Sequence, residues 1–448
     1  MRKIILRMLG ILSAVMLLAG CTQIGNTKPT SEVSDGTNPL AVEEPTEVSG
    51  DSVNLTEGRT GVDAEEALPT DAETASLSDA SLALFEEVMA EKEGENVLLS
   101  PISIDFALGM TENGAAGDTL SQMENTVNGG IKIDQLNPLM KHLSNRFMNA
   151  DDVKWNIANS IWFKNDGKFA MKDHFLDQAV GFYNADVFLA PFDEQTLADI
   201  NLWVNDETNG MIPEILDSIH PNAKMYLVNA IAFEGEWMEQ YEDDKIYEDR
   251  EFSNLDGSTS KITMMGSKEN RYFTIADGQG FVKPYKGGEY SFVGILPAEN
   301  ESPEELIAKI NKSKIDFAKT VREAGFTEVT VQIPEFNNDF GIELNDTYEE
   351  LGMDNPFDPA QANFHEMMET TDGSPAAIWI GRILHKTHIE VDRKGTKAAA
   401  ATVVEMRTKN AIMMDETKYV ILNRPFVYVI VENETGLPVF IGCQNSMK

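Results

Sequence analysis

The chain has 448 residues, of which 42% are hydrophobic and 8% aromatic, enough to build a packed core and more than a disordered chain carries. Its 74 acidic against 36 basic residues give a net charge of −38, which makes nucleic acid a poor partner because association would begin against a repulsive field. With only two cysteines, Cys21 and Cys443, and no Cys/His cluster, the sequence excludes a multi-disulfide scaffold and argues against structural zinc.

Residues 1–20 have the pattern of an export signal. Arg2, Lys3 and Arg7 precede an apolar run over 8–19 that is shorter than a membrane-spanning helix needs, which disfavours the alternative of a single-pass anchor. The segment ends in Leu-Ala-Gly before Cys21 and resembles the bacterial lipobox. The resemblance implies that residues 1–20 are a lipoprotein signal peptide and that Cys21 carries the lipid.

Residues 21–76 follow as an acidic stretch rich in Thr, Ser, Glu, Asp, Gly and Pro, without helical or strand periodicity. Such a segment buries too little apolar surface to offset its ordering entropy. We expect an extended tether between a lipid and a folded body at 77–448.

The body begins with helical spacing over 77–90 and continues with a mostly apolar stretch over 97–110, in which Pro101 predicts a helix start. A second long helical stretch is expected at 197–216. Seven stretches have the composition of strands: 153–163, 225–233, 292–296, 329–333, 388–391, 419–421 and 426–431. Helices that cluster early and strands that cluster late predict an α+β fold.

The sequence contains no GxSxG elbow, P-loop, GxGxxG turn or HExxH motif, so we expect no catalytic residues, cofactor or metal. His385 and His388 are spaced for one face of a helix, but their neighbours favour a strand, which would place them on opposite faces. We therefore interpret them as structural histidines.

The unusual segment is Lys394 to Lys409, KGTKAAAATVVEMRTK. An alanine run favours a helix, but the β-branched residues that follow it favour a strand. With a period of two, one face is small or apolar throughout, and the other carries every charge between Lys397 and Arg407. This is the pattern of a strand with one buried face, although its flanks look like an exposed loop; both hold if the segment moves about Gly395. An ordinary helix or edge strand is the alternative.

The hinge GTKAAAAT resembles that of inhibitory serpins, and other motifs agree in the same order: NVLLSPIS at 96–103, LVNA to FEGEW at 227–237 and NRPF at 423–426. The resemblance covers essentially all of 77–448. It implies a serpin fold with three β-sheets, eight or nine α-helices and an exposed reactive loop at about 395–424. The hinge residues it implies are Gly395, Thr396, Ala398, Ala399, Ala400 and Ala401.

The resemblance also implies roles inside the central sheet. Ser100, Ser103, Asn229 and His385 match the shutter, a polar cluster under strands that must part, and Trp237 matches the breach, where insertion starts. The implied function is suicide inhibition of a serine protease: the loop is cleaved, the acyl-enzyme is trapped and the loop inserts. We expect a protease inhibitor and not an enzyme, monomeric, on the outer side of a bacterial cell envelope or released as a soluble domain.

Counting from the hinge as the family does places the reactive bond between Lys409 and Asn410, which predicts a trypsin-like target, since such a protease binds a basic side chain against a carboxylate. Arg407 is the alternative bait residue, and Met406 or Met413 would indicate a chymotrypsin- or elastase-like target. Two departures from the family stand out: Arg393 and Lys397 replace the usual Glu, and the stretch 410–425 is a few residues longer than is usual in the family. Two other functions stay open, a non-inhibitory surface-binding or adhesin serpin and an inhibitor of papain-like cysteine proteases.

Overall fold

A computed structural model describes residues 48, 50–372, 378–396 and 418–448. The helices are α1 (Asp71–Glu91), α2 (Pro101–Glu112), α3 (Gly117–Thr126), α4 (Ile133–Met148), α5 (Asp173–Tyr183), α6 (Glu194–Glu207), α7 (Pro303–Lys312), α8 (Phe317–Arg322) and α9 (Asn345–Glu350). Two 3-10 turns, η2 and η3, lie at Asp243–Lys245 and Asn355–Phe357.

The strands fall into three sheets in the described part of the chain. The central sheet runs β1 (Val53–Asn54), β5 (Asp186–Ala190), β3 (Val153–Lys164), β6 (Met225–Glu236), β15 (Gly395–Thr396), β14 (Arg382–Val391) and β12 (Phe336–Glu343). The second sheet runs β16 (Lys418–Ile421), β11 (Gly325–Pro334), β8 (Thr259–Ile275), β9 (Gly278–Pro284), β10 (Tyr290–Leu296), β17 (Phe426–Glu432), β18 (Pro438–Gln444) and β2 (Val97–Leu99), with β7 (Ile246–Ser253) beside β8. The third sheet is the pair β4 (Phe169–Met171) and β13 (Met368–Thr370).

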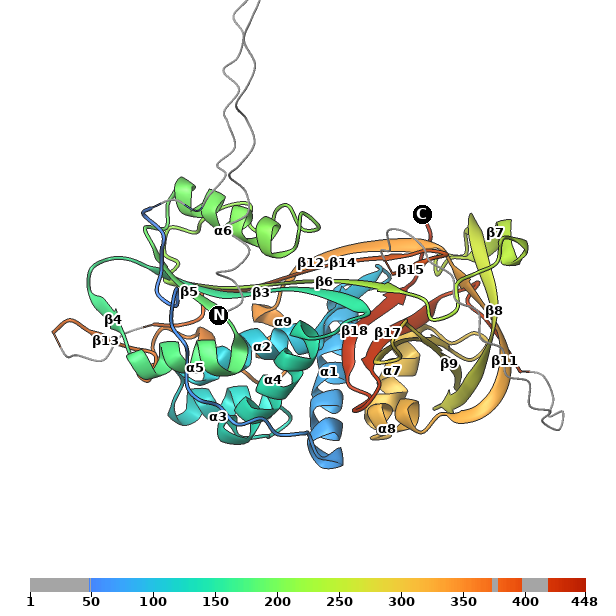
Figure 1. Cartoon of the computed structure of the whole chain (residues 1–448), viewed down its shortest axis with the longest axis horizontal. Coiled ribbons are helices and arrows are strands. Elements are labelled where there is room, and N and C mark those ends of the chain that lie inside the picture. Colours follow the sequence, from blue (N-terminus) through green and yellow to red (C-terminus); the bar gives the residue numbers. More distant parts are fainter. Residues whose placement is uncertain (1–47, 49, 373–377, 397–417) are drawn as a thin grey trace, which may run out of the picture. The chain divides into compact units, whose positions relative to one another are not determined.

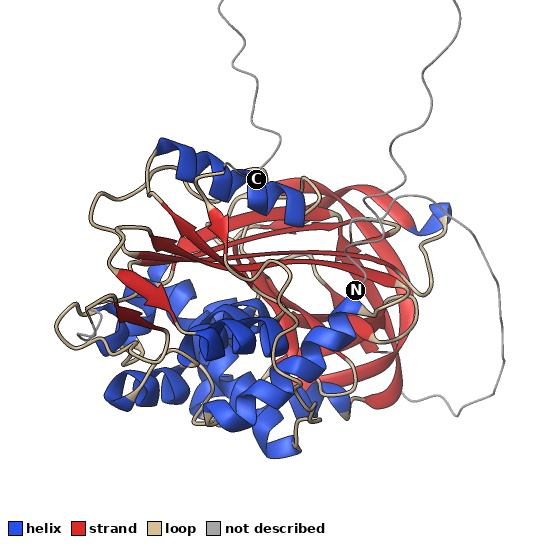
Figure 2. Cartoon of the chain, turned by 60° about the vertical axis from the view of Figure 1, so that its left-hand side comes forward, coloured by secondary structure: helices blue, strands red, loops and turns tan. Residues whose placement is uncertain are grey.

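Helices cover both faces of the central sheet unequally. Figure 1 shows α6 on one face and α1 to α5 with α9 on the other, and the turned view of Figure 2 shows the same separation. Three sheets and nine α-helices within the described residues confirm the predicted α+β class. None of the helices in this part of the chain combines the length and hydropathy needed to cross a membrane.

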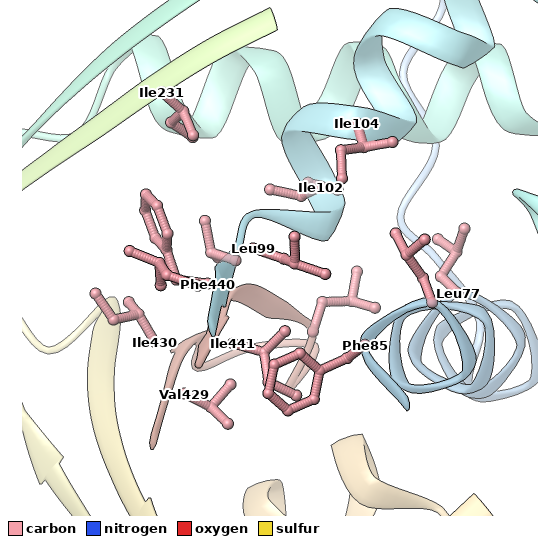
Figure 3. Close-up of a cluster of buried hydrophobic side chains, with 14 of the residues drawn as sticks. Leu77, Phe85, Leu99, Ile102, Ile104, Ile231, Val429, Ile430, Phe440 and Ile441 are labelled. Carbon is pink, nitrogen blue, oxygen red and sulfur yellow. The ribbon is translucent and has the colours of Figure 1, made fainter. Parts of the chain in front are cut away.

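The main core lies where α1 and α2 meet strands of both large sheets. Figure 3 shows Leu77 and Phe85 of α1 and Ile102 of α2 around Phe440 and Ile441 of β18. At this junction helix and strand side chains from both ends of the sequence exclude water together. A second cluster, which includes Trp162 and Trp203, packs α6 against the other face of the central sheet.

The predicted elements are present, with different ends. The helix expected at 197–216 is α6, which ends at Glu207 just before Asn209 and Gly210, both at positive φ. The short strand expected at 388–391 is the end of the longer β14. His385 is buried and His388 lies near the surface beside Asp339, so the two histidines face opposite ways as predicted.

The expected boundary between tether and body at 76/77 is corrected by the structure. Helix α1 begins at Asp71 because Thr70 and Glu73 form a capping box. Residues 50–70, here called the strap, lie against the body: β1 pairs with β5, and Arg59 binds Asp173 at 2.7 Å. The strap lacks periodicity because backbone pairing and polar contacts hold it, and neither leaves a hydrophobic pattern. Residues 21–47 and 49 of the expected tether, Cys21 among them, lie outside the described residues.

Candidate insertion site in the central sheet

Two neighbouring strands of the central sheet part at one end and form a fork. β6 and β14 run parallel and pair from Tyr226 with Arg382 up to Ala232 with His388. Beyond that point β15 lies between them, with Thr396 opposite both Gly235 of β6 and Val391 of β14. The structure therefore places the first two hinge residues as the beginning of a new central strand (Figure 1).

Gly395 enters the fork where the backbones are too close for a side chain. A Cβ on this residue would lie 2.0 Å from the carbonyl oxygen of Gly235. Glycine is therefore required here by close approach.

Thr396 is fully buried, and its hydroxyl lies 2.6 Å from the hydroxyl of Tyr285. Tyr285 stacks on Trp237 with ring centroids 4.8 Å apart and planes 9° apart. Burial raises the pKa of Tyr285 well above its usual value, so this hydroxyl stays protonated and can donate to Thr396. The buried Thr396 hydroxyl is thus hydrogen-bonded to Tyr285.

Trp237, expected at the breach, holds the chain that leads into the hinge. Its indole Nε1 donates to the carbonyl of Asp392 at 2.8 Å, and its backbone N–H donates to the carbonyl of Lys394 at 2.9 Å. Asp392 in turn accepts from the backbone N–H groups of Lys394 and Gly395. The turn that leads into β15 is thereby fixed relative to β6.

The four residues expected as a shutter lie in one buried cluster beneath β6 and β14. The Ser100 N–H donates to Nε2 of His385 at 3.0 Å, which leaves the proton on Nδ1 to donate to Oδ1 of Asn229 at 2.9 Å. The Asn229 amide contacts the Ser103 hydroxyl at 2.5 Å and donates to Oδ1 of Asn159 at 2.7 Å. These bonds link α2 and three neighbouring central strands across the line where β6 and β14 would have to separate.

Burial lowers the pKa of His385 to about 3, since a charged ring would lose hydration and a second proton would face the Ser100 N–H. The neutral ring is therefore favoured in the folded state, and the unfolded state, with a pKa near 6.5, binds the extra proton first. Stability from His385 is complete above about pH 6.5 and is lost as the pH falls toward 3. When the pH falls from 7 to 5, we expect protonation of this residue in the unfolded state to lower the free energy of unfolding by about 2 kcal/mol.

The measurement is chemical denaturation of wild type and His385→Gln at pH 7, 6 and 5. The glutamine variant should begin less stable and lose less on acidification, because its side chain does not titrate. Parallel pH profiles for the two proteins would contradict the assignment.

Arg393 stands where the family usually has Glu, and it has an acidic partner in this protein. Its Nε donates to Oε1 of Glu335 at 3.2 Å, just before β12 begins. Both side chains are partly exposed, so the pair contributes at most about 1 kcal/mol.

We expect Arg393→Glu to lower unfolding free energy by about 1 kcal/mol, because two carboxylates would then meet at the base of the hinge. Adding Glu335→Arg should restore at least half of the loss by recreating the pair with reversed charges. The measurement is a double-mutant cycle from denaturation curves. Additive effects of the two substitutions would show that the residues do not interact.

Some contacts at the fork have no counterpart in the sequence analysis. Lys283 is buried on β9, pairs with Glu269 at 2.9 Å and lies over the rings of Trp237 and Tyr241. A lysine that follows Phe281 and Val282 inside an apolar run was a usable signal, since a buried cation needs a partner. Tyr285 and Asn159 carried no such signal.

The remaining site predictions lie outside the described residues: Ala398, Ala399, Ala400, Ala401, Arg407, Lys409 and Asn410.

Comparison with known proteins agrees with this geometry. The family model "Serpin (serine protease inhibitor)" matches residues 75–446. The chain belongs to the serpin family. Serpin-Z7 of Hordeum vulgare is 32% identical over 371 residues, covering 79% of this chain and 90% of the relative. Leukocyte elastase inhibitor A of Mus musculus is 29% identical over 381 residues, covering 81% and 96%.

Solved serpin structures give the same result. The thermophilic serpin tengpin in its native state is 38% identical, with a TM-score of 0.80, and covers 89% of this chain and 100% of its own. Tengpin in its latent state has a lower TM-score of 0.73 at 37% identity, covering 86% and 100%. The described part of this serpin therefore resembles the native form more.

Proposed function

We propose that this serpin inhibits a serine-type protease as a suicide substrate, with Lys409 as its bait residue and a trypsin-like enzyme as its target. The fork between β6 and β14 is the observation that carries the proposal. It already holds Gly395 and Thr396, so the residues after them can continue as a strand once β6 and β14, which pair directly beyond this point, separate.

The length and composition of the following segment support insertion. Fourteen residues from Thr396 to Lys409 extend roughly 46 Å at about 3.3 Å each. β6, beside which they would lie, has 12 residues. The face that continues from buried Thr396 is small or apolar at every second position up to Met406, so it can enter the sheet without burying a charge.

The chemistry follows from these parts. The protease serine attacks the carbonyl of Lys409, the bond to Asn410 breaks, and the Asn410 amine leaves with a proton from the protease histidine. The ester that remains ties the protease to Lys409. Insertion of the loop then moves the ester-linked protease and distorts the protease active site before water can hydrolyse the ester. The free energy for this distortion comes from strain stored in the uncleaved fold.

The anchor is a separate part of the proposal. We infer that Cys21 carries a lipid and holds the serpin on the outer side of a bacterial cell envelope, on the strength of the lipobox-like sequence and the acidic stretch after it.

Mixing the chain with trypsin tests the inhibitory function. We expect a complex that survives denaturing electrophoresis and a released fragment whose sequence starts at Asn410. A Lys409→Ala variant should lose complex formation with trypsin at least about tenfold, because the trypsin pocket requires a basic residue.

Other outcomes of the trypsin experiment would change the proposal in defined ways. A fragment that starts at Thr408 would move the bait to Arg407. Complex formation only with a papain-like protease would replace the proposed target class. Cleavage of the reactive loop without any covalent complex would contradict the inhibitory function and favour a surface-binding role.

A further inference from the structure

A lysine lies inside the second sheet next to Trp237. Lys283, on β9, is 1% exposed, and its ammonium has a carboxylate partner in Glu269 on β8 at 2.9 Å. It also donates to the carbonyl of Glu239 at 3.3 Å. The Ser267 hydroxyl donates to the same Glu269 oxygen at 2.6 Å. A buried ammonium needs such partners because it has lost its hydration, and these partners fix its position.

The same ammonium lies over two aromatic rings. Its nitrogen is 5.3 Å from the centre of the Trp237 ring and 4.6 Å from the centre of the Tyr241 ring. The two rings meet edge to face, with planes 90° apart. Aromatic faces attract a cation that lies within about 6 Å of the ring centre. Lys283 therefore joins the Trp237 indole to a charged group that the second sheet holds in place.

Trp237 needs a defined orientation because its edge carries a hydrogen bond to the turn before β15. Its Nε1 donates to the carbonyl of Asp392 at 2.8 Å, and sliding of the ring would break this bond. Stacking on Tyr285 fixes the plane of the ring but permits sliding within that plane. An ammonium at a fixed point favours the ring position in which the face of the indole lies nearest to it.

The ion pair between Lys283 and Glu269 is a poor means of stabilising the fold. Buried pairs are often replaced by neutral side chains of similar size without loss of stability, because the desolvation of both charges offsets their attraction. An uncharged side chain could fill the same space beside Trp237 and Tyr241. It would not supply the attraction that orients the indole.

We propose that Lys283 is a positioning residue for loop insertion: held by Glu269, it orients Trp237 so that the indole keeps the turn from Asp392 to Gly395 at the mouth of the fork. Its effect on inhibition rests on the function proposed above, but its effect on the turn does not. Without this charge the turn leaves its place more often. Insertion then begins later after cleavage, and more of the acyl-enzyme is hydrolysed first.

The test removes both charges and keeps the volume of both side chains, with Lys283→Met and Glu269→Gln combined in the full-length chain. In hydrogen exchange, the amides of Trp237 and Gly395, which are both hydrogen-bonded at the turn, should exchange about fivefold faster than in wild type. The stoichiometry of trypsin inhibition should rise about threefold. The denaturation midpoint should stay unchanged, because the pair adds little net stability.

A second variant asks whether Lys283 acts through the indole. Trp237→Phe keeps a ring in the stack and removes Nε1, so by itself it should speed exchange of the Gly395 amide. Added to the double variant, it should bring little further change, because both act on the same hydrogen bond. The matched control is Lys268→Gln with Glu328→Gln, which removes an exposed ion pair between β8 and β11 and should leave exchange and stoichiometry as in wild type.

The outcomes separate this proposal from the proposed function. Exchange at Trp237 and Gly395 equal to that of wild type would overturn the role of Lys283, whatever the result with trypsin. Faster exchange throughout both large sheets with a lower midpoint, full additivity with Trp237→Phe, or faster exchange at the turn with an unchanged stoichiometry would each overturn its role in insertion. If wild type forms no complex with trypsin but exchange at the turn speeds up as expected, the proposed function fails and the positioning of the turn by Lys283 stands.

Discussion

Under the proposed function, Thr396→Arg should turn this serpin from an inhibitor of trypsin into a substrate. The variant should still be cut in its reactive loop, but the stoichiometry of inhibition should rise at least about tenfold. This is one of the two largest effects that we expect from a single substitution.

The physical reason lies at the fork. Thr396 is fully buried between β6 and β14, and its side chain ends 2.6 Å from the Tyr285 hydroxyl. An arginine there must bury an unpaired charge or hold the strands apart, at a cost of several kcal/mol. Insertion slows while hydrolysis of the acyl-enzyme continues at its own rate, so most protease molecules escape.

The control uses the neighbouring residue. Lys397 falls on the opposite, charged face in the period-two pattern, so Lys397→Glu should keep the stoichiometry within about twofold of wild type. Ala400→Arg repeats the test further along the inward face without disturbing the contact at Tyr285. Trypsin should cleave the reactive loop in both Lys397→Glu and Ala400→Arg. Denaturing electrophoresis then compares the amounts of complex and of cleaved serpin that each variant gives. Full inhibition by Thr396→Arg and Ala400→Arg would show that this face does not enter the sheet.

The sequence predicted the parts of the site that depend on local pattern or on motifs shared with the family. Alternation placed Thr396 on a face that must be buried, and the structure buries it. Strand composition placed His385 and His388 on opposite faces, and the resemblance grouped His385 with Asn229, which the structure joins at 2.9 Å.

What the sequence did not predict depends on partners far along the chain. Tyr285 meets Thr396 across 111 residues, and Glu335 meets Arg393 across 58, so neither pair leaves a local pattern. The strap was missed for the same reason, because its two-residue strand β1 is stabilised by the edge of β5 and not by its own composition. Such contacts are fixed by tertiary structure, which overrides local propensity.

Asn229→Ala should destabilise the native protein by about 3 kcal/mol and increase its rate of polymerisation on mild heating. The Asn229 amide binds His385, Ser103 and Asn159 at once, so its loss leaves several buried polar groups without partners. Each unsatisfied group costs about 1–3 kcal/mol, and part of that cost is recovered if water enters the space.

The expected polymerisation separates this cluster from an ordinary buried network. Its bonds tie β3, β6 and β14 to α2, so removing them loosens the strands that the fork already separates at one end. An opened sheet has unpaired strand edges that accept a segment from another copy of the chain. Asn222→Ala, at an exposed position just before β6, is the matched control and should change neither denaturation nor polymerisation. If Asn229→Ala lowers stability but polymerises no faster than wild type at matched distance from its unfolding midpoint, the cluster only fixes the core; if it also polymerises faster, the same bonds control opening of the central sheet.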